Sequence, residues 1–250
     1  SADLEKKIVG ELLLKSSGKV SVSRVDKKQR TRNPAAPFTT STLQQESVRK
    51  LGFTTRGTMM TAQQLYEGIN IGEGSVGLIT YMRTDSMSLS NDSTSQIRKY
   101  LETNYAKEFF PQKAIGYKTK AKNAQEAHEA IRPTNIERTP QSLKPYLSEQ
   151  QFKLYEIIWK RTLACQMSPA IFDAVSIDLE VGQGESIFRA TGQTLKFAGF
   201  MSVYLEEEDE SQKNDSEISI FPELEVGETL LVDKIMGVQH FTEPTPRFSE

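Results

Sequence analysis

Apolar residues recur at two different periods along this chain, and the changes of period divide it into segments. Residues 4–14 show helical spacing that Gly18 ends, and residues 20–25 then alternate between valine and polar side chains. This pattern predicts an amphipathic helix followed by a half-buried strand. Residues 26–37 are basic and contain two prolines, each of which keeps the residue before it extended. A linker is therefore expected there.

Helical spacing dominates the middle of the chain. Thr42 followed by Gln45 fits a capping box, and Gly52 is the expected end of that helix. The glycine-rich run 69–77 predicts a turn, because it lacks the lysine that a phosphate-binding loop requires. Further helices are expected at residues 58–67, from Asn91, from Asn123 to Pro133, and from Ser148, where Gln151 completes a second capping box.

Alternation returns after Pro169. Strands are expected at residues 175–181, 187–195 and 229–236, and residues 202–219 have the composition of a flexible loop. Since strand patterns flank the helical block on both sides, we expect the strand at 20–25 to join the later sheet. The sequence thus predicts an α+β fold, in which an all-helical domain is inserted into a discontinuous β-rich domain. The predicted borders are 38–167 for the helical domain, and 1–37 with 168–250 for the β-rich domain.

The composition restricts the chemistry that the chain can carry. Its single cysteine, Cys165, excludes an internal disulfide and a cysteine-cluster zinc site, and two histidines leave little room for a histidine-based metal site. No apolar run approaches the ~18 residues that a membrane span needs. No secretory signal pattern opens the sequence. These features suit a cytoplasmic protein.

The net charge is −2, but the charges are unevenly distributed. Residues 15–56 are rich in lysine and arginine, opposed only by Asp26 and Glu46, whereas residues 206–210 are all acidic. A local basic field attracts phosphates whatever the total charge is. A solvated basic strand and an acidic loop would give the same pattern.

The stretch GLITYMRTDSMSLS, residues 77–90, carries the most specific chemistry. In an extended backbone, the period of two puts Tyr81, Arg83 and Asp85 on one side. A tyrosine hydroxyl can attack phosphorus, an arginine fork can hold the non-bridging oxygens, and the carboxylate can fix the arginine. On spacing alone, a strand edge with a surface ion pair is the commoner meaning of such a pattern.

This stretch resembles the active-site segment of the type IA DNA topoisomerases, whose tyrosine forms a 5′-phosphotyrosyl link to cut single-stranded DNA. Met82 is typical of the bacterial topoisomerase I branch, whereas the topoisomerase III branch usually has proline there. The resemblance implies that Tyr81 and Arg83 are catalytic. Met82 disfavours a topoisomerase III relative. Whether the chain is a reverse gyrase relative could be judged only from the full gene.

Three further stretches resemble the same family. Residues 123–134, NAQEAHEAIRPT, place His128 between Glu126 and Glu129, where carboxylates favour the imidazolium. The resemblance implies a phosphate contact for His128, although a surface charge cluster is the alternative. Arg132 fits a helix-end ion pair better than a phosphate contact. The other two stretches are residues 37–67 and 241–250. Together with the tyrosine segment and residues 123–134, the resemblance implies that the DNA-binding residues are Gln63, Glu67, Thr80, Asp85, His128 and Arg247.

The resemblance also implies parts that this sequence lacks. In the family, magnesium is bound by a separate TOPRIM domain, and no D-x-D carboxylate pair suited to magnesium occurs here. We therefore expect no metal or cofactor in this chain, and an excised middle fragment of a larger enzyme, inactive alone. Its expected partners are single-stranded and negatively supercoiled DNA, the TOPRIM domain and a C-terminal DNA-binding domain, with no membrane partner and a cytoplasmic, nucleoid-associated location. The alternative is a non-catalytic single-strand-binding or partner-docking module.

Overall fold

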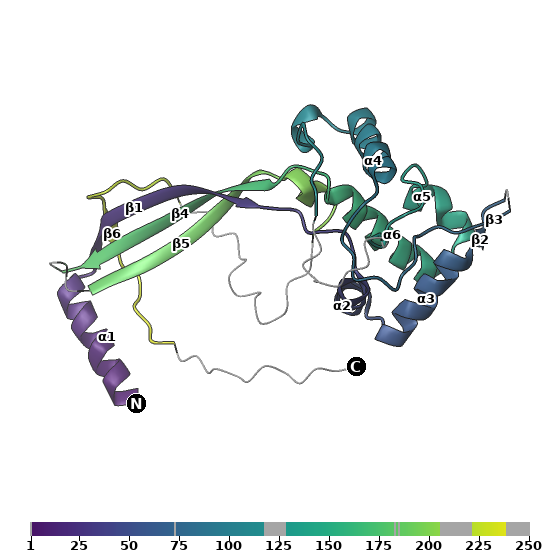
Figure 1. Cartoon of the computed structure of the whole chain (residues 1–250). Coiled ribbons are helices and arrows are strands. Elements are labelled where there is room, and N and C mark those ends of the chain that lie inside the picture. Colours follow the sequence, from purple (N-terminus) through teal and green to yellow (C-terminus); the bar gives the residue numbers. More distant parts are fainter. Residues whose placement is uncertain are drawn as a thin grey trace. The chain divides into compact units, whose positions relative to one another are not determined.

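A computed structural model of the chain describes residues 2–72, 74–117, 129–182, 184, 186–205 and 222–238. The chain divides into two compact units, 1–30 with 171–196 and 216–249, and 31–170 with 197–215. We call the first the sheet unit and the second the helical unit, and each is described by itself (Figure 1). Helices and strands are both present, as the α+β class requires.

The described residues of the sheet unit form one helix and a four-stranded sheet. Its elements are α1 (Ala2–Ser16), β1 (Lys19–Arg32), β4 (Ala170–Val181), β5 (Ser186–Phe197) and β6 (Thr229–Leu231), and the strand order is β5-β4-β1-β6. β1 and β6 are antiparallel, with Val20 opposite Leu230. Strand β1 therefore joins the later strands, which confirms the prediction from the alternating valines.

Several strands in this unit have borders that differ from the prediction, and one of them is β4, which begins at Ala170 instead of residue 175. Strand β1 continues to Arg32, although a linker was expected from Asp26 onward. Its charged side chains stay in solvent while the backbone pairs, and Asp26 accepts a 2.8 Å hydrogen bond from Lys28. Strand β6 is shorter than the expected 229–236 and ends at Leu231. Local apolar alternation does not report how much of a strand has a neighbour to pair with.

The helical unit is built around a core from three helices. α2 (Thr40–Leu51), α3 (Thr55–Glu67) and α6 (Glu149–Ala164) contact one another and bury their apolar faces. The remaining helical elements are α4 (Asn91–Asn104), η1 (Lys107–Phe109), α5 (Pro140–Leu143), η2 (Lys144–Tyr146) and η3 (Gly199–Ser202). The core is filled by Leu43, Ala62, Leu65, Leu154, Tyr155 and Ile158, all fully buried.

Several helix ends follow the sequence signals, but α3 begins at Thr55 rather than at the expected residue 58. Ser148 and Gln151 form the predicted capping box of α6, and Gly52 closes α2 in the left-handed conformation with φ of 65°. The capping box of α2 is formed by Thr39 and Thr42, rather than by Thr42 and Gln45. The glycine-rich run forms a small hairpin of β2 (Ile69–Asn70) and β3 (Ser75–Val76). Residues 123–128 of the helix predicted from Asn123 to Pro133, and most of the predicted loop 202–219, lie outside the described residues. Residues 129–133 are described and are not helical, because Ile131 and Pro133 form β-bridges with Phe38 and Ile79.

A buried arginine fixes the chain where it enters α2. Arg161 of α6 is 5% exposed, and its Nε donates a 2.6 Å hydrogen bond to the carbonyl of Ala36. Its guanidinium also lies over the ring of Phe38, 4.9 Å from the ring centroid. Because the residues before α2 are held this way, the N-terminus of that helix has a fixed place beside the tyrosine segment.

Candidate active site

The segment that carries Tyr81 alternates strictly between open and covered side chains. Tyr81, Arg83 and Asp85 are exposed, whereas Met82, Thr84 and Ser86 are buried. This is the period-two arrangement that the sequence indicated, although the segment is not part of a regular strand. Because Met82 is only 1% exposed, the core anchors the segment from beneath while a phenol, a guanidinium and a carboxylate reach solvent together.

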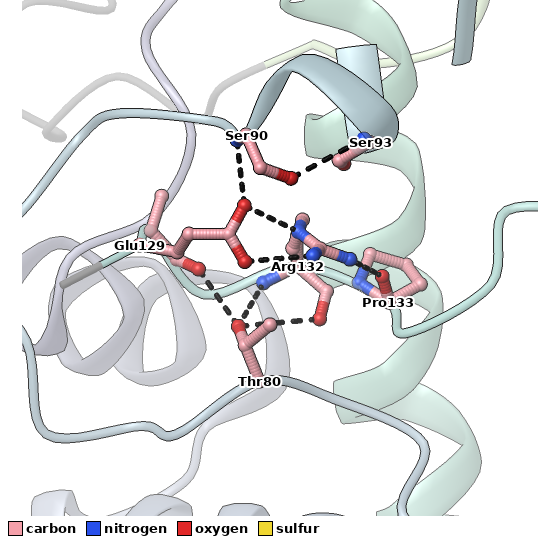
Figure 2. Close-up of polar contacts among 7 residues, drawn as sticks. Thr80, Ser90, Ser93, Glu129, Arg132 and Pro133 are labelled. Atoms are coloured by element: carbon pink, nitrogen blue, oxygen red, sulfur yellow. Dashed lines mark hydrogen bonds and ion pairs between the residues drawn. The ribbon is translucent and has the colours of Figure 1, made fainter. Parts of the chain in front are cut away.

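Residues 129–134 hold one side of this segment. The Thr80 hydroxyl donates to the Ala130 carbonyl at 2.7 Å and accepts the N–H of Arg132 at 3.0 Å (Figure 2). The backbone N–H of Thr80 donates to the Arg132 carbonyl at 2.9 Å, and Ile79 forms a bridge with Pro133. Thr80 is thus locked immediately before Tyr81, with its hydroxyl proton committed to the protein.

An ion pair stabilises the segment that Thr80 contacts. Arg132 donates to Glu129 through Nε at 3.2 Å and through a terminal nitrogen at 2.7 Å, as Figure 2 shows. Glu129 also accepts the backbone N–H of Ser90, the N-cap residue of α4, at 2.6 Å. Burial raises the pKa of Glu129, but the hydrogen bonds from Arg132 and Ser90 outweigh burial and bring that pKa below its usual value. The predicted ion pair of Arg132 is present, but it is not at a helix end, because residues 129–134 are not helical.

Helix α2 holds the other side of the tyrosine segment. Thr40, its first residue, donates its backbone N–H to the carbonyl of Thr84 at 2.9 Å. The Thr40 hydroxyl donates to the carbonyl of Met82 at 2.7 Å. The backbone on both sides of Arg83 is therefore fixed by one residue of α2.

Helix α3 approaches Tyr81 with its last turn. The ring of Tyr66 lies 5.3 Å from the ring of Tyr81, centroid to centroid. Gln63 and Glu67 lie on the same helix and bond to each other, Nε2 to Oε1, at 2.6 Å. The expected DNA-binding residues of α3 are thus carried by a helix that touches the tyrosine, but their hydrogen bond joins them to each other.

One predicted interaction is absent, and two predicted residues are not described. Arg83 and Asp85 form no ion pair with each other in the described structure, contrary to the expectation that the carboxylate fixes the arginine. An exposed ion pair is worth only about 0–1 kcal/mol and must offset the entropy of two ordered side chains. His128 and Arg247 lie outside the described residues.

Two residues that the sequence did not single out contact the segment directly. Tyr66 touches the ring of Tyr81, and Thr40 bonds the backbone around Arg83. Both come from segments far from Tyr81 along the chain, so no local periodicity could link them to it. The only signal was that both lie in stretches resembling the family, where many residues match without a role.

A protein metal site commonly gathers several His, Cys, Asp or Glu side chains. No three His, Cys, Asp or Glu side chains among them are placed to hold a metal ion. The described residues therefore do not fit a magnesium ion, and we derive no step through one. No helix in the described part of the chain is long and apolar enough to cross a membrane.

The sequence and the fold both match one class of protein. A family model described as DNA topoisomerase matches residues 2–250. The chain is 52% identical over 237 residues to DNA topoisomerase 1 of Xylella fastidiosa (strain Temecula1), a match that covers 94% of this chain and 29% of that relative. It is 50% identical over 229 residues to DNA topoisomerase 1 of Rickettsia felis, covering 92% of this chain and 29% of the relative.

A solved structure has the same fold. Full-length topoisomerase I from Thermotoga maritima superposes with a TM-score of 0.74 at 35% sequence identity, covering 93% of this chain and 35% of that one. The chain therefore belongs to the type IA DNA topoisomerases, in the bacterial topoisomerase I family. It spans about 29% of the length of these curated relatives.

Proposed function

We propose that this chain is the strand-cleaving part of a type IA topoisomerase that relaxes negatively supercoiled DNA. The observation that carries the proposal is the exposure of Tyr81 and Arg83 on one side of a segment whose alternate residues are buried. Attack needs an accessible phenol, and charge stabilisation needs a guanidinium that reaches the same phosphate. The family membership of the chain supports assigning both roles here.

In this mechanism the oxygen of Tyr81 attacks a phosphorus of the DNA backbone. A bond forms between the phenol oxygen and phosphorus, the bond from phosphorus to the 3′-oxygen breaks, and the phenol loses its proton while the 3′-oxygen gains one. A neutral phenol is a weak nucleophile, so a neighbouring cation matters. Arg83 is positioned by backbone contacts on both sides, and its guanidinium stabilises the negative charge that develops on the phosphate.

The remaining site residues have supporting roles in this proposal. Thr80, proposed as a DNA contact, also holds the backbone next to Tyr81 through the hydrogen bond from its hydroxyl to Ala130. Asp85 is exposed on the same side as Tyr81 and lines the path of the strand. Gln63 and Glu67 act as a bonded pair on α3. His128 and Arg247 are proposed as phosphate contacts on their resemblance to the family.

The organisation of the whole enzyme is also part of the proposal. Residues 38–167 form the domain that carries the tyrosine, while residues 1–37 and 168–250 form the hinge that lets this domain move. Magnesium would be held by a TOPRIM domain, and a C-terminal domain would hold DNA. The chain by itself is expected neither to cleave nor to relax DNA, and the whole enzyme is expected to act on cytoplasmic DNA.

The test is adduct formation by the whole enzyme that carries this chain. A single-stranded oligonucleotide should become attached to Tyr81 through a 5′-phosphate, and mass spectrometry of the protease-digested adduct should identify that residue. Tyr81→Phe should abolish the adduct and the relaxation of supercoiled plasmid. Tyr146→Phe is the matched control, since Tyr146 is similarly exposed, at 46% against 44% for Tyr81, and should retain both activities. Relaxation by Tyr81→Phe, as a non-catalytic binding module would give, or an adduct on another residue, rejects the proposal.

A further inference from the structure

The side chain of Tyr81 has an aromatic neighbour on a different element. Tyr66 stands in the last turn of α3, and its ring plane is tilted by 60° to that of Tyr81, with centroids 5.3 Å apart. Both side chains are partly open to solvent, with 41% of Tyr66 and 44% of Tyr81 exposed. Tilted pairs at roughly 4.5–7 Å attract each other beyond the effect of buried area. The contact therefore restrains a ring that would otherwise turn in solvent.

The backbone holds the two tyrosines in this relation through their neighbours. The N–H of Leu78 donates to the carbonyl of Leu65 at 2.7 Å, which ties the approach to Tyr81 to the end of α3. Gly77 lies so close to this helix that an added Cβ would be 2.7 Å from the carbonyl oxygen of Tyr66. On its other side, Leu78 accepts the N–H of Thr134 at 3.0 Å. The ring contact is thus part of a fixed junction rather than a chance meeting of two side chains.

The freedom of the Tyr81 ring bears on its reactivity. An exposed aromatic side chain can occupy several staggered χ1 wells, and only one of them directs its oxygen to a given phosphate. In-line attack needs the reacting atoms about 3–3.5 Å apart and aligned. Within the described part of the chain the Tyr81 hydroxyl makes no hydrogen bond, so the ring contact with Tyr66 is what can select the well.

We propose that Tyr66 is a positioning residue, whose ring holds the ring of Tyr81 in the orientation from which its oxygen attacks DNA. This inference rests on the proposed function, since it presupposes that Tyr81 is the nucleophile. Tyr66 touches neither phosphate nor leaving group in this role. It acts through its ring and not through its hydroxyl, so a phenylalanine in its place should serve equally well.

The experiment compares Tyr66→Phe and Tyr66→Leu in the whole enzyme that carries this chain. Single-turnover cleavage of a single-stranded oligonucleotide gives the rate constant, and fluorescence anisotropy with the same oligonucleotide gives Kd. Tyr66→Leu should lower the rate constant about 2- to 10-fold, the range expected for losing an aromatic pair, with Kd unchanged. Tyr66→Phe should restore the unmodified rate. Tyr66→Gln, which also suits a helix, replaces the leucine variant if that variant loses its folded circular dichroism spectrum.

The controls separate failure of this inference from failure of the proposed function. Tyr146→Leu removes an equally open tyrosine and should leave the rate constant unchanged. If Tyr81→Phe still forms the adduct, the proposed function itself is wrong. If Tyr81→Phe is inactive but Tyr66→Leu cleaves at the unmodified rate, only the positioning role is wrong. A raised Kd with an unchanged rate constant would mean that Tyr66 contacts DNA, and slowing by Tyr66→Phe would mean that the hydroxyl acts; either result overturns the inference.

Discussion

The side chain of Thr40 is bonded to the backbone of Thr84: its Oγ1 accepts the N–H of Thr84 at 2.8 Å. The same hydroxyl donates to the carbonyl of Met82, and the backbone N–H of Thr40 donates to the carbonyl of Thr84. One residue at the start of α2 thus bonds to one atom of each peptide group that flanks Arg83. Since buried backbone groups need partners, the orientation of Arg83 depends on this hydroxyl.

Replacing Thr40 by valine keeps its shape but removes the hydroxyl. The N–H of Thr84 then loses its partner, which costs about 1–3 kcal/mol of the free energy of unfolding. Urea unfolding of this chain should show the loss as a lower midpoint, and adduct formation by the whole enzyme should slow because Arg83 loses its support. Thr40→Ser retains the hydroxyl and is the matched control. Equal unfolding midpoints for the valine and serine variants would contradict the role of this bond.

The close approach at Gly77 predicts a second effect. In Gly77→Ala the new methyl group would lie 2.7 Å from the carbonyl oxygen of Tyr66, which is backbone and cannot swing aside. Overpacking of this kind costs typically about 1–3 kcal/mol, and the approach to Tyr81 would shift. Both the free energy of unfolding and the cleavage rate constant should fall.

Gly116 provides the comparison for that substitution. An added Cβ at Gly116 meets nothing within 4 Å, and its φ is not in the left-handed region. Gly116→Ala should therefore change the free energy of unfolding by less than about 0.5 kcal/mol. If the two alanine variants are equally stable, the helix and the tyrosine segment are not packed as described.

The ion pair between Glu129 and Arg132 predicts a dependence of stability on pH. Hydrogen bonds from Arg132 and Ser90 bring the pKa of Glu129 below the usual 4.5, despite the opposing effect of burial. A carboxyl whose pKa is lower in the folded state stabilises the fold above its unfolded value, and this contribution is lost as pH falls through the folded value. Glu129→Gln should therefore cost about 1 kcal/mol near pH 7, and progressively less below about pH 4.5.

Urea unfolding of both proteins from pH 7 down to pH 3 measures this difference. Glu149→Gln is a suitable control, because Glu149 is also in an ion pair, with Lys153, but its side chain is 79% exposed. Exposed pairs contribute little, so that variant should differ less from the unmodified chain. A Glu129→Gln penalty that stays constant across the whole pH range would show that the lowered pKa has no part in stability.

Local chemistry accounts for the features that were predicted correctly. The Ser148 capping box and the Gly52 helix end each depend on residues within one turn, and those residues are adjacent in the chain. For α2, however, the predicted N-cap was Thr42, whereas in the structure Thr42 is the partner of Thr39 in the capping box. Thr39 became the N-cap and Thr40 bonded to Thr84, an interaction across 44 residues that no window around α2 contains.

By itself the sequence determined the alternation that exposes Tyr81 and Arg83, because a period of two is a property of extended backbone. It also carried the resemblance that the family match confirmed. Only the tertiary structure decided that Tyr66 lies against Tyr81, that Thr40 supports Arg83, and that Asp85 leaves Arg83 unpaired in the described residues. The first two outcomes depend on which distant elements pack together. The third depends on whether the attraction of an exposed ion pair exceeds the entropy lost in ordering its two side chains. Residue spacing within one segment determines neither.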